Sequence, residues 1–477
     1  MKSKIILIIL LTISGRAFAQ TDSLAHYLNV AAQNNPTIKA EFLTYKASLE
    51  RVPQASPIPD PQLEMGFFLK PMEIIDGKQI ANFQLMQMFP WFGTRRAARN
   101  EATEMARMAY EKFRETRDNL FFEVKNSWYT LQNLQQQLTN IRENRVLLVA
   151  LKELSTNRFA APSVSGSAKT SAQSIPATSP TQPAASGGMA GMEGATGSSV
   201  QPQQAQSMGQ MSGGGAMSGG TGGGMSDVLR IELELNELEE QEQALLSQIT
   251  TAKARFNSLL SRSAQEAVIL PDSISQRVFS LDDDFIMETI RRQNPMLAMA
   301  NAEADAYKAK LEMDKKMGLP MLGIGLQYSV IGKRMDMGIP ISDMNGKDMI
   351  MPMVTVSIPI WRKKYTAAQN ESRFMRQAAE QKHQSTLDNL TSEYISIREQ
   401  LADAQRKVML YEKQRRLAEA TYQLSLREYA AGMSSISNVL DIERQLLEYK
   451  FKRSSAVATY NTVVAMIENL LSEPQNE

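Results

Sequence analysis

The chain presents one series of local sequence patterns twice, and this repetition limits it to folds built from two similar halves. Asn35-Pro36 returns as Asn294-Pro295. Phe89-Pro90-Trp91, which precedes two arginines, returns as Ile358-Pro359-Ile360-Trp361, which precedes three basic residues. The two copies differ mainly by about 60 extra residues in the first, inserted between Ala161 and Val228.

The N-terminus has the pattern of a secretory signal peptide. Lys2 and Lys4 precede the apolar run Ile5–Ile13, and Ala17-Phe18-Ala19 forms a small-x-small cleavage site. The run is too short to span a bilayer as a helix, and a retained anchor is the alternative. The expected segments are a signal peptide (1–19), repeat 1 (20–270), an insert within it (162–225), a linker (271–281), repeat 2 (282–472) and a tail (473–477).

The composition excludes several classes of protein. The 52 basic and 51 acidic residues give a net charge of +1, so the chain lacks the basic excess of a nucleic-acid-binding protein. Because there is no cysteine, disulfides, thiolate metal sites and thiol nucleophiles are excluded. No catalytic or phosphate-binding motif occurs. We therefore expect a protein that is not an enzyme and needs no cofactor.

Each copy contains two runs in which apolar residues alternate with polar or small ones, as in a strand with one apolar face. In the second of these runs, Phe83 and Leu85 alternate with Gln84 and Met86. Runs of about ten residues match tilted transmembrane strands. Four strands cannot close a barrel, because small barrels need about eight, so several chains must share one. The expected strands are 62–69, 79–89, 321–330 and 350–358.

A long heptad pattern follows each strand pair. In the second copy, apolar residues from Leu387 to Tyr411 recur at steps of three and four. A helix from Lys363 to Ala430 would be about 100 Å long. A returning helix continues the pattern after a short turn, where Gly432 is the expected helix stop. The two helices therefore predict an antiparallel coiled-coil hairpin.

This order of elements resembles the TolC-like family of outer-membrane efflux proteins. The resemblance rests on the signal peptide, the tandem repeat, the Asn-Pro pairs, the Pro-containing strand ends, and Tyr429-x-x-Gly432 before Val439-Leu440. It implies an α+β membrane protein in the outer membrane of a Gram-negative bacterium, with a large periplasmic portion. Three chains would share a 12-stranded β-barrel, four strands from each, continuous with a long periplasmic coiled-coil tunnel. The implied partners are two further copies, a periplasmic adaptor (membrane fusion) protein, an inner-membrane efflux pump and outer-membrane lipid.

The resemblance also implies roles for residues at the turn of the second hairpin. Tyr429, Gly432, Met433 and Ser434 match the tip with which family members meet the adaptor. This interpretation places the tip at the periplasmic end of the tunnel.

Beyond the tip, several family members place acidic side chains around the periplasmic aperture. Asp441 matches one such position and Asn438 the other, while Asp227 stands at the matching helix start of the first copy. Three copies of Asp441 would form a carboxylate ring that attracts cations. Alternatively, Asp441 is a first-turn acid stabilised by the helix dipole.

The insert lies where the first copy would have only a short turn. It holds 15 of the 26 glycines but only two charged residues, so it cannot build a core. Its methionines are soft ligands that favour Cu(I) and Ag(I) over hard cations. A low-complexity insertion tolerated at an exposed tip is the alternative. The methionines are Met189, Met192, Met208, Met211, Met217 and Met225.

Further methionines fall on the polar face of the expected strands, which we assign to the lumen. They would line the exit of the duct as the insert lines its entrance; the alternative is that they only fill space. These residues are Met86, Met88, Met321, Met351 and Met353.

The sequence therefore predicts the passive outer-membrane channel of a tripartite efflux system, with Cu(I)/Ag(I) as cargo, as in a heavy-metal, CusC-like branch. Within the same class, multidrug or other small-molecule efflux is the alternative. A periplasmic coiled-coil scaffold and a metal-sequestering protein are alternatives of another class, but a scaffold has no use for four alternating strands.

Overall fold

The computed structural model describes residues 24–74, 76–160, 225–280, 282–335, 343 and 345–472. The same order of elements occurs twice along the chain. The first series is α2 (Leu24–Asn34), α3 (Pro36–Gln54), β1 (Gln62–Ile74), β2 (Gly77–Phe89), α4 (Thr94–Ala160) and α5 (Met225–Leu259). The second is α6 (Asp283–Gln293), α7 (Pro295–Met317), β3 (Met321–Gly332), β4 (Met349–Ser357), α8 (Arg362–Ala430) and α9 (Ile436–Leu471).

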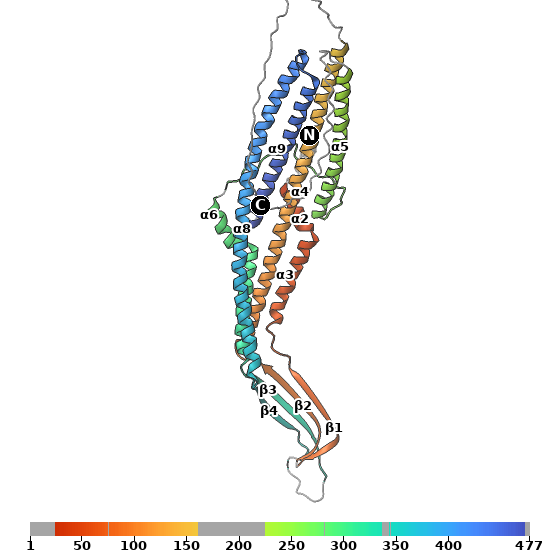
Figure 1. Cartoon of the computed structure of the whole chain (residues 1–477). Helices are drawn as coiled ribbons and strands as arrows, with labels where there is room; N and C mark the ends of the chain where they lie inside the picture. The colour runs from red at the N-terminus through yellow and green to blue at the C-terminus, as the bar shows by residue number, and fades with distance from the viewer. Residues whose placement is uncertain are drawn as a thin grey trace, which may run out of the picture.

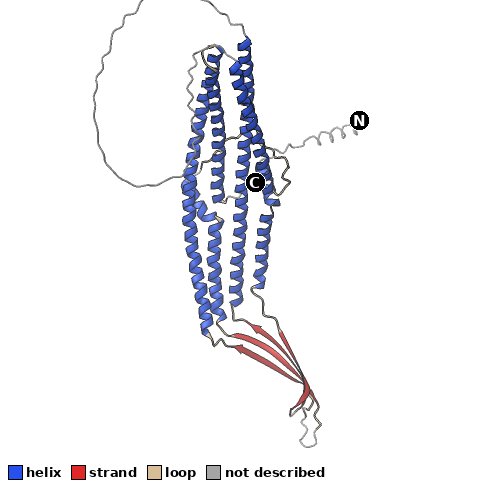
Figure 2. Cartoon of the chain, turned by 45° about the vertical axis from the view of Figure 1, so that its right-hand side comes forward, coloured by secondary structure: helices blue, strands red, loops and turns tan. Residues whose placement is uncertain are grey.

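The molecule is elongated, with the described helices along one part of its length and the four described strands at one end (Figure 1). In the half near the strands, α3 contacts α4, and α7 contacts both α4 and α8. In the other half, α4 is paired with α5 and α8 with α9 (Figure 2). The tip of the helical part and the outer end of the sheet therefore lie at opposite ends of the molecule.

The strands form one antiparallel sheet in the order β1-β2-β3-β4. The four predicted strands are confirmed, although β1 continues five residues beyond the expected end to Ile74. Gly77, which has a φ of +139°, lies at the turn between β1 and β2. The edges of the sheet, β1 and β4, have no strand partner within the described part of the chain.

The predicted hairpin of long helices is also confirmed. Helix α8 has 69 residues, and the heptad residues Leu390, Tyr394 and Ile397 are buried. Gly432 takes a left-handed φ of +80° after the helix ends at Ala430. The Met433 amide then donates to the Glu428 carbonyl (2.8 Å), which satisfies one of the orphan acceptors of the last turn.

The interior of the helical part contains three groups of buried side chains. One surrounds Trp128 and Phe256, a second follows α4, α5, α8 and α9 towards the tip, and a third joins α6 to the last turns of α9. Within the described residues, no helix is both long enough and apolar enough to cross a membrane.

Candidate functional site

The register of the sheet places all five predicted strand methionines on one face with polar or small partners. Residues directly opposite each other in an antiparallel sheet point to the same side. Met86 pairs with Gly325, which pairs with Met353, and the neighbouring row contains Met88, Gly323 and Thr355. A third row contains Gln84, Gln327 and Met351. Met321, at the start of β3, has the same alternation and pairs with Ser357.

The opposite face of the sheet is apolar and exposed. Leu63 pairs with Leu85, which pairs with Leu326, and Ile324 pairs with Val354. All five of these side chains are classed as exposed in the single chain. A contiguous apolar surface of this kind marks contact with a membrane or a partner.

Two glycines make room for the methionine side chains of β2. A Cβ atom on Gly323 would lie 2.5 Å from Met88 Sδ and 3.3 Å from Met86 Sδ. A Cβ on Gly325 would lie 3.2 Å from the same Met86 sulfur. The Thr355 hydroxyl donates to Met86 Sδ across 3.7 Å. Two thioethers and one hydroxyl thus converge over the backbone of β3.

Tyr429 lies inside the tip, with only 1% of its surface exposed. Its hydroxyl lies 2.7 Å from Ser155 Oγ and 3.5 Å from Asp227 Oδ2. Arg158 donates to the Tyr429 carbonyl oxygen (2.8 Å), and its guanidinium lies 4.9 Å from the centre of the tyrosine ring. The side chain therefore fastens the ends of α4, α5 and α8 together.

The rest of the predicted docking tip is more accessible. Met433 is 78% exposed and Gly432 is also exposed. Ser434 accepts a hydrogen bond from the Asn438 side-chain amide (3.2 Å). Asn438 is therefore part of the cap at the start of α9.

The structure brings Asp441 and a basic residue together. The Asp441 side chain is 72% exposed, and its carboxylate lies 3.9 Å from Arg444. Arg444 also donates to both carboxylate oxygens of Glu234. Asp227, the other acidic residue of the predicted aperture, accepts a hydrogen bond from the Tyr429 hydroxyl. A cation at Asp441 would thus compete with Arg444 for the carboxylate.

A buried carboxyl group that was not predicted from the sequence lies close to the tip. Glu443 on α9 is 1% exposed, and Oε1 accepts a hydrogen bond from the Asn144 amide of α4. Oε2 has no hydrogen-bond partner in the described part of the chain. Burial raises the pKa of Glu443 to about 7, with a smaller contribution from Glu234. The hydrogen bond from Asn144 and the charges of Arg444 and Lys450 oppose the shift.

The sequence did contain a signal for this group. Glu443 lies four residues after Val439 and three before Leu446, which is the spacing of the buried seam of a coiled coil. A carboxyl residue at such a position is buried unless the helices separate.

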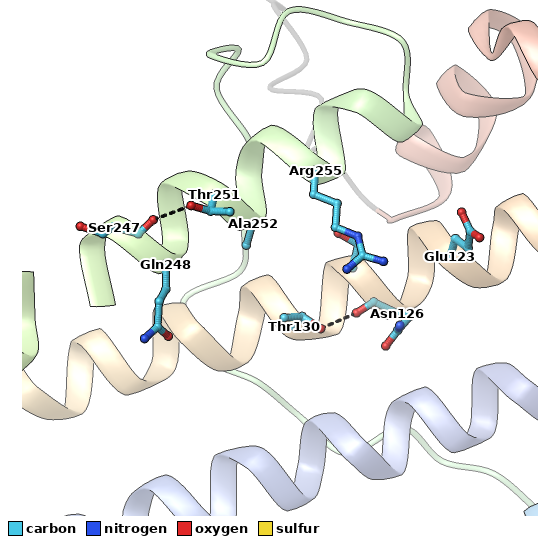
Figure 3. A pocket seen from close by; sticks show the side chains of 9 residues that line it. Glu123, Asn126, Thr130, Ser247, Gln248, Thr251, Ala252 and Arg255 are labelled. Carbon is cyan, nitrogen blue, oxygen red and sulfur yellow. Dashed lines mark hydrogen bonds between the residues drawn. The ribbon is translucent and has the colours of Figure 1, made fainter. Parts of the chain in front are cut away.

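A groove of about 440 Å³, lined mainly by residues with polar side chains, lies between α4 and α5 (Figure 3). The Thr130 hydroxyl donates to the Asn126 carbonyl (2.9 Å) and the Thr251 hydroxyl to the Ser247 carbonyl (3.1 Å). These hydroxyls are thus used within their own helices, and the groove contains no nucleophile held by a base. Its lining residues are Glu123, Asn126, Ser127, Thr130, Ser247, Gln248, Thr251, Ala252 and Arg255.

Five of the six insert methionines, Met189, Met192, Met208, Met211 and Met217, lie outside the described residues. The same is true of the predicted signal peptide and tail. Met225 is described, and it is the exposed first residue of α5. Among the described residues, no group of three or more His, Cys, Asp or Glu side chains is arranged to hold a metal ion.

Residues 286–465 match the family model described as outer membrane efflux protein. The fold is similar to that of VceC, an outer membrane protein of Vibrio cholerae (TM-score 0.64, 13% identity, 94% of this chain and 96% of that chain). It is also similar to the MtrE outer membrane channel of Neisseria gonorrhoeae (TM-score 0.61, 12% identity, 94% and 88%). No curated protein matches the sequence.

CusC also has a similar structure (TM-score 0.58, 13% identity, 96% of this chain and 93% of that chain). The resemblance to the TolC-like family is confirmed. The identities to VceC, MtrE and CusC are nearly equal, so assignment to a CusC-like branch stays a prediction.

Proposed function

We propose that this chain, a member of the outer membrane efflux protein family by its residues 286–465, forms the exit duct of a tripartite efflux system. The observation that carries the proposal is the four-stranded sheet, apolar on one face and polar on the other, at the end of helices such as α8. The apolar face would contact outer-membrane lipid, and the polar face would line the duct. The long helices would continue that duct into the periplasm.

Closure of the duct requires further copies of the chain. The edge strands β1 and β4 carry backbone donors and acceptors that lipid cannot satisfy. Pairing of β4 with β1 of the next copy would satisfy them. Three copies would give twelve strands, which leaves a central space, whereas two copies would give eight, which side chains fill.

The opposite end of the molecule is the proposed contact for an adaptor and a pump. Gly432 and Met433 protrude there, whereas Tyr429 is buried and supports the tip from within. The end of α4 and the start of α5, which flank the insert in the sequence, lie at this same end. The proposed role of the insert methionines is therefore at the entrance of the duct.

The proposed cargo is Cu(I) or Ag(I). Thioethers are preferred by these soft ions, and Met86 and Met88 place two sulfur atoms beside Gly323 on the polar face. Such ligands bind weakly enough for the ion to leave, as a conducting site requires. The amides of Gln84 and Gln327 on the same face favour the alternative cargo, polar small molecules.

Sensitivity of a deletion strain tests the cargo. We expect loss of the protein to increase sensitivity to copper and silver, and the intact protein to restore tolerance. Sensitivity to drugs and bile salts with unchanged metal tolerance would keep the channel but exclude the soft-metal cargo.

A further inference from the structure

A cluster of basic residues follows each strand pair directly. In the first repeat, Trp91 and Phe92 precede Arg95-Arg96, and in the second Trp361 precedes Arg362-Lys363-Lys364. Helices α4 and α8 begin at Thr94 and Arg362, so both clusters lie in a first helical turn. Efflux through the duct does not explain why both helices begin with cations.

The structure places these clusters at one level of the molecule. A Cβ atom on Gly93 would lie 2.4 Å from Lys316 Nζ, which belongs to the end of α7. A Cβ on Gly318, just after α7, would lie 3.5 Å from the side chain of Tyr365 in α8. The start of α4, the end of α7 and the start of α8 thus lie close together. Figure 2 shows the helices ending at the level where the strands begin.

An apolar cavity of about 700 Å³ opens at this level, between the sheet and the start of α4. Ile324 and Val354, both on the apolar face, form one wall. Phe92, which is 81% exposed, forms another. Arg95 and Arg96 line the cavity beside these groups. The cavity therefore combines a wall continuous with the apolar face and a cationic side.

The two arginines that line the cavity have no acidic partner among the described residues. Arg95 Nε donates to the Ser56 carbonyl (2.9 Å), which orients the guanidinium without removing its charge. Neither Arg95 nor Arg96 forms a salt bridge within the part of the chain that the structure describes, whereas the charge of Lys316 acts on Glu312 of the same helix. The N-terminus of α4 adds its own partial positive charge. An anionic group would be stabilised here by several donors at once.

We propose that this cavity binds an anionic glycerophospholipid of the inner leaflet of the outer membrane. Its acyl chain would lie against Ile324, Val354 and Phe92, and its phosphate would accept hydrogen bonds from Arg95 and Arg96. A soluble anion would leave the apolar wall exposed to water, whereas a lipid covers both parts of the cavity. The inference rests on the proposed placement of the sheet in the membrane but not on the cargo.

Native mass spectrometry of the purified oligomer tests the proposal. The protein is titrated with phosphatidylglycerol, with phosphatidylcholine of the same chain length, or with inorganic phosphate. We expect selective retention of phosphatidylglycerol, and we expect Arg95→Gln with Arg96→Gln to weaken it by about 30-fold. Arg406→Gln with Arg416→Gln is the matched control, because these exposed arginines lie far along α8.

A second variant distinguishes lipid binding within the cavity from lipid attraction by surface charge alone. Val354→Trp fills the cavity and leaves every cation in place, and we expect it to reduce retention of phosphatidylglycerol as well. Equal retention of the two lipids, retention unchanged in the arginine variant, or full competition by inorganic phosphate would overturn the proposal. Single-channel conductance of the same variants shows whether the duct itself remains, so failure of the lipid site is distinguishable from failure of the duct.

Discussion

The side-chain amide of Asn294 donates a hydrogen bond to the carbonyl oxygen of Leu470 across 3.1 Å. Its oxygen accepts from the Met296 amide (3.0 Å), so one side chain caps α7 and fastens it to the last turn of α9. Asn35 does the same in the first half, where it caps α3 and donates to Leu259 (3.0 Å). The asparagine of each Asn-Pro pair thus joins the start of one helix to the end of the last helix in the same half.

Asn294→Ala removes both of these interactions and leaves the buried Leu470 carbonyl oxygen without its donor. We expect a loss of about 1–2 kcal/mol in the free energy of unfolding, which thermal unfolding of the purified protein measures. Gln384→Ala on the exposed surface of α8 is the control, with a change within about 0.5 kcal/mol. Equal effects of the two substitutions would contradict the closing role of Asn294.

Glu443 gives the stability of the tip a pH dependence. Its pKa in the folded protein, about 7, lies above the ordinary value of 4.5 for a glutamate, because burial penalises the charged form. The contribution of this group is therefore fully present below about pH 4.5. It declines as the pH rises towards 7, by at most about 3 kcal/mol in all.

Glu443→Gln keeps the shape of the side chain and removes its titration. We expect the melting temperature of the variant to change less between pH 5 and pH 8 than that of the wild type, and to exceed it at pH 8. Glu448→Gln, an exposed carboxyl group on the same helix, is the control. A pH dependence unaltered by Glu443→Gln would show that other groups dominate.

Tyr429 contacts Ser155 and Asp227 inside the tip, and Arg158 holds Tyr429 in place. Tyr429→Phe with Arg158→Gln removes the hydroxyl contacts, the bond to the carbonyl and the stacked cation. We expect a larger and less stable single-channel conductance in planar bilayers. Arg427→Gln, at an exposed position two residues before Tyr429, leaves these contacts in place and serves as the control. Identical conductance of all three proteins would refute a fastening role.

The thioether pair on the polar face predicts a selective phenotype. Met86→Leu with Met88→Leu keeps volume and apolar character but removes both soft ligands, so silver and copper tolerance should fall. Tolerance of drugs and bile salts should stay normal. Met65→Leu, on the apolar face of β1, is the matched control. If silver tolerance survives in the double variant, the strand methionines only fill space.

The amino-acid pattern predicted the helices and strands well because each pattern repeats many times along its element. Strand alternation and the heptad seam extend over many residues, so the four strands and α8 were located to within a few positions. Side-chain placement within the tip was not predictable in this way. The family resemblance assigned Tyr429 to the tip that meets the adaptor, but its side chain is buried because α4 and α5 lie against it.

The contacts between Met86, Met88 and Gly323 could not be predicted either. Alternation places a residue on a face, but the row in which it lies depends on the register between β2 and β3. Those strands are separated by more than 200 residues of sequence, and no local pattern fixes their pairing.

We propose that β4 of one copy pairs with β1 of the next copy. Cross-linking between these two strands tests this pairing most directly. The chain has no cysteine, so Leu63→Cys in β1 with Val356→Cys in β4 introduces the only thiols. Both residues lie near the same end of the sheet, but two strands separate them within one chain. With a short thiol-specific cross-linker in membranes, the account predicts covalent dimers and trimers from the double variant and neither from the single variants. A double variant that remains entirely monomeric under these conditions would contradict it.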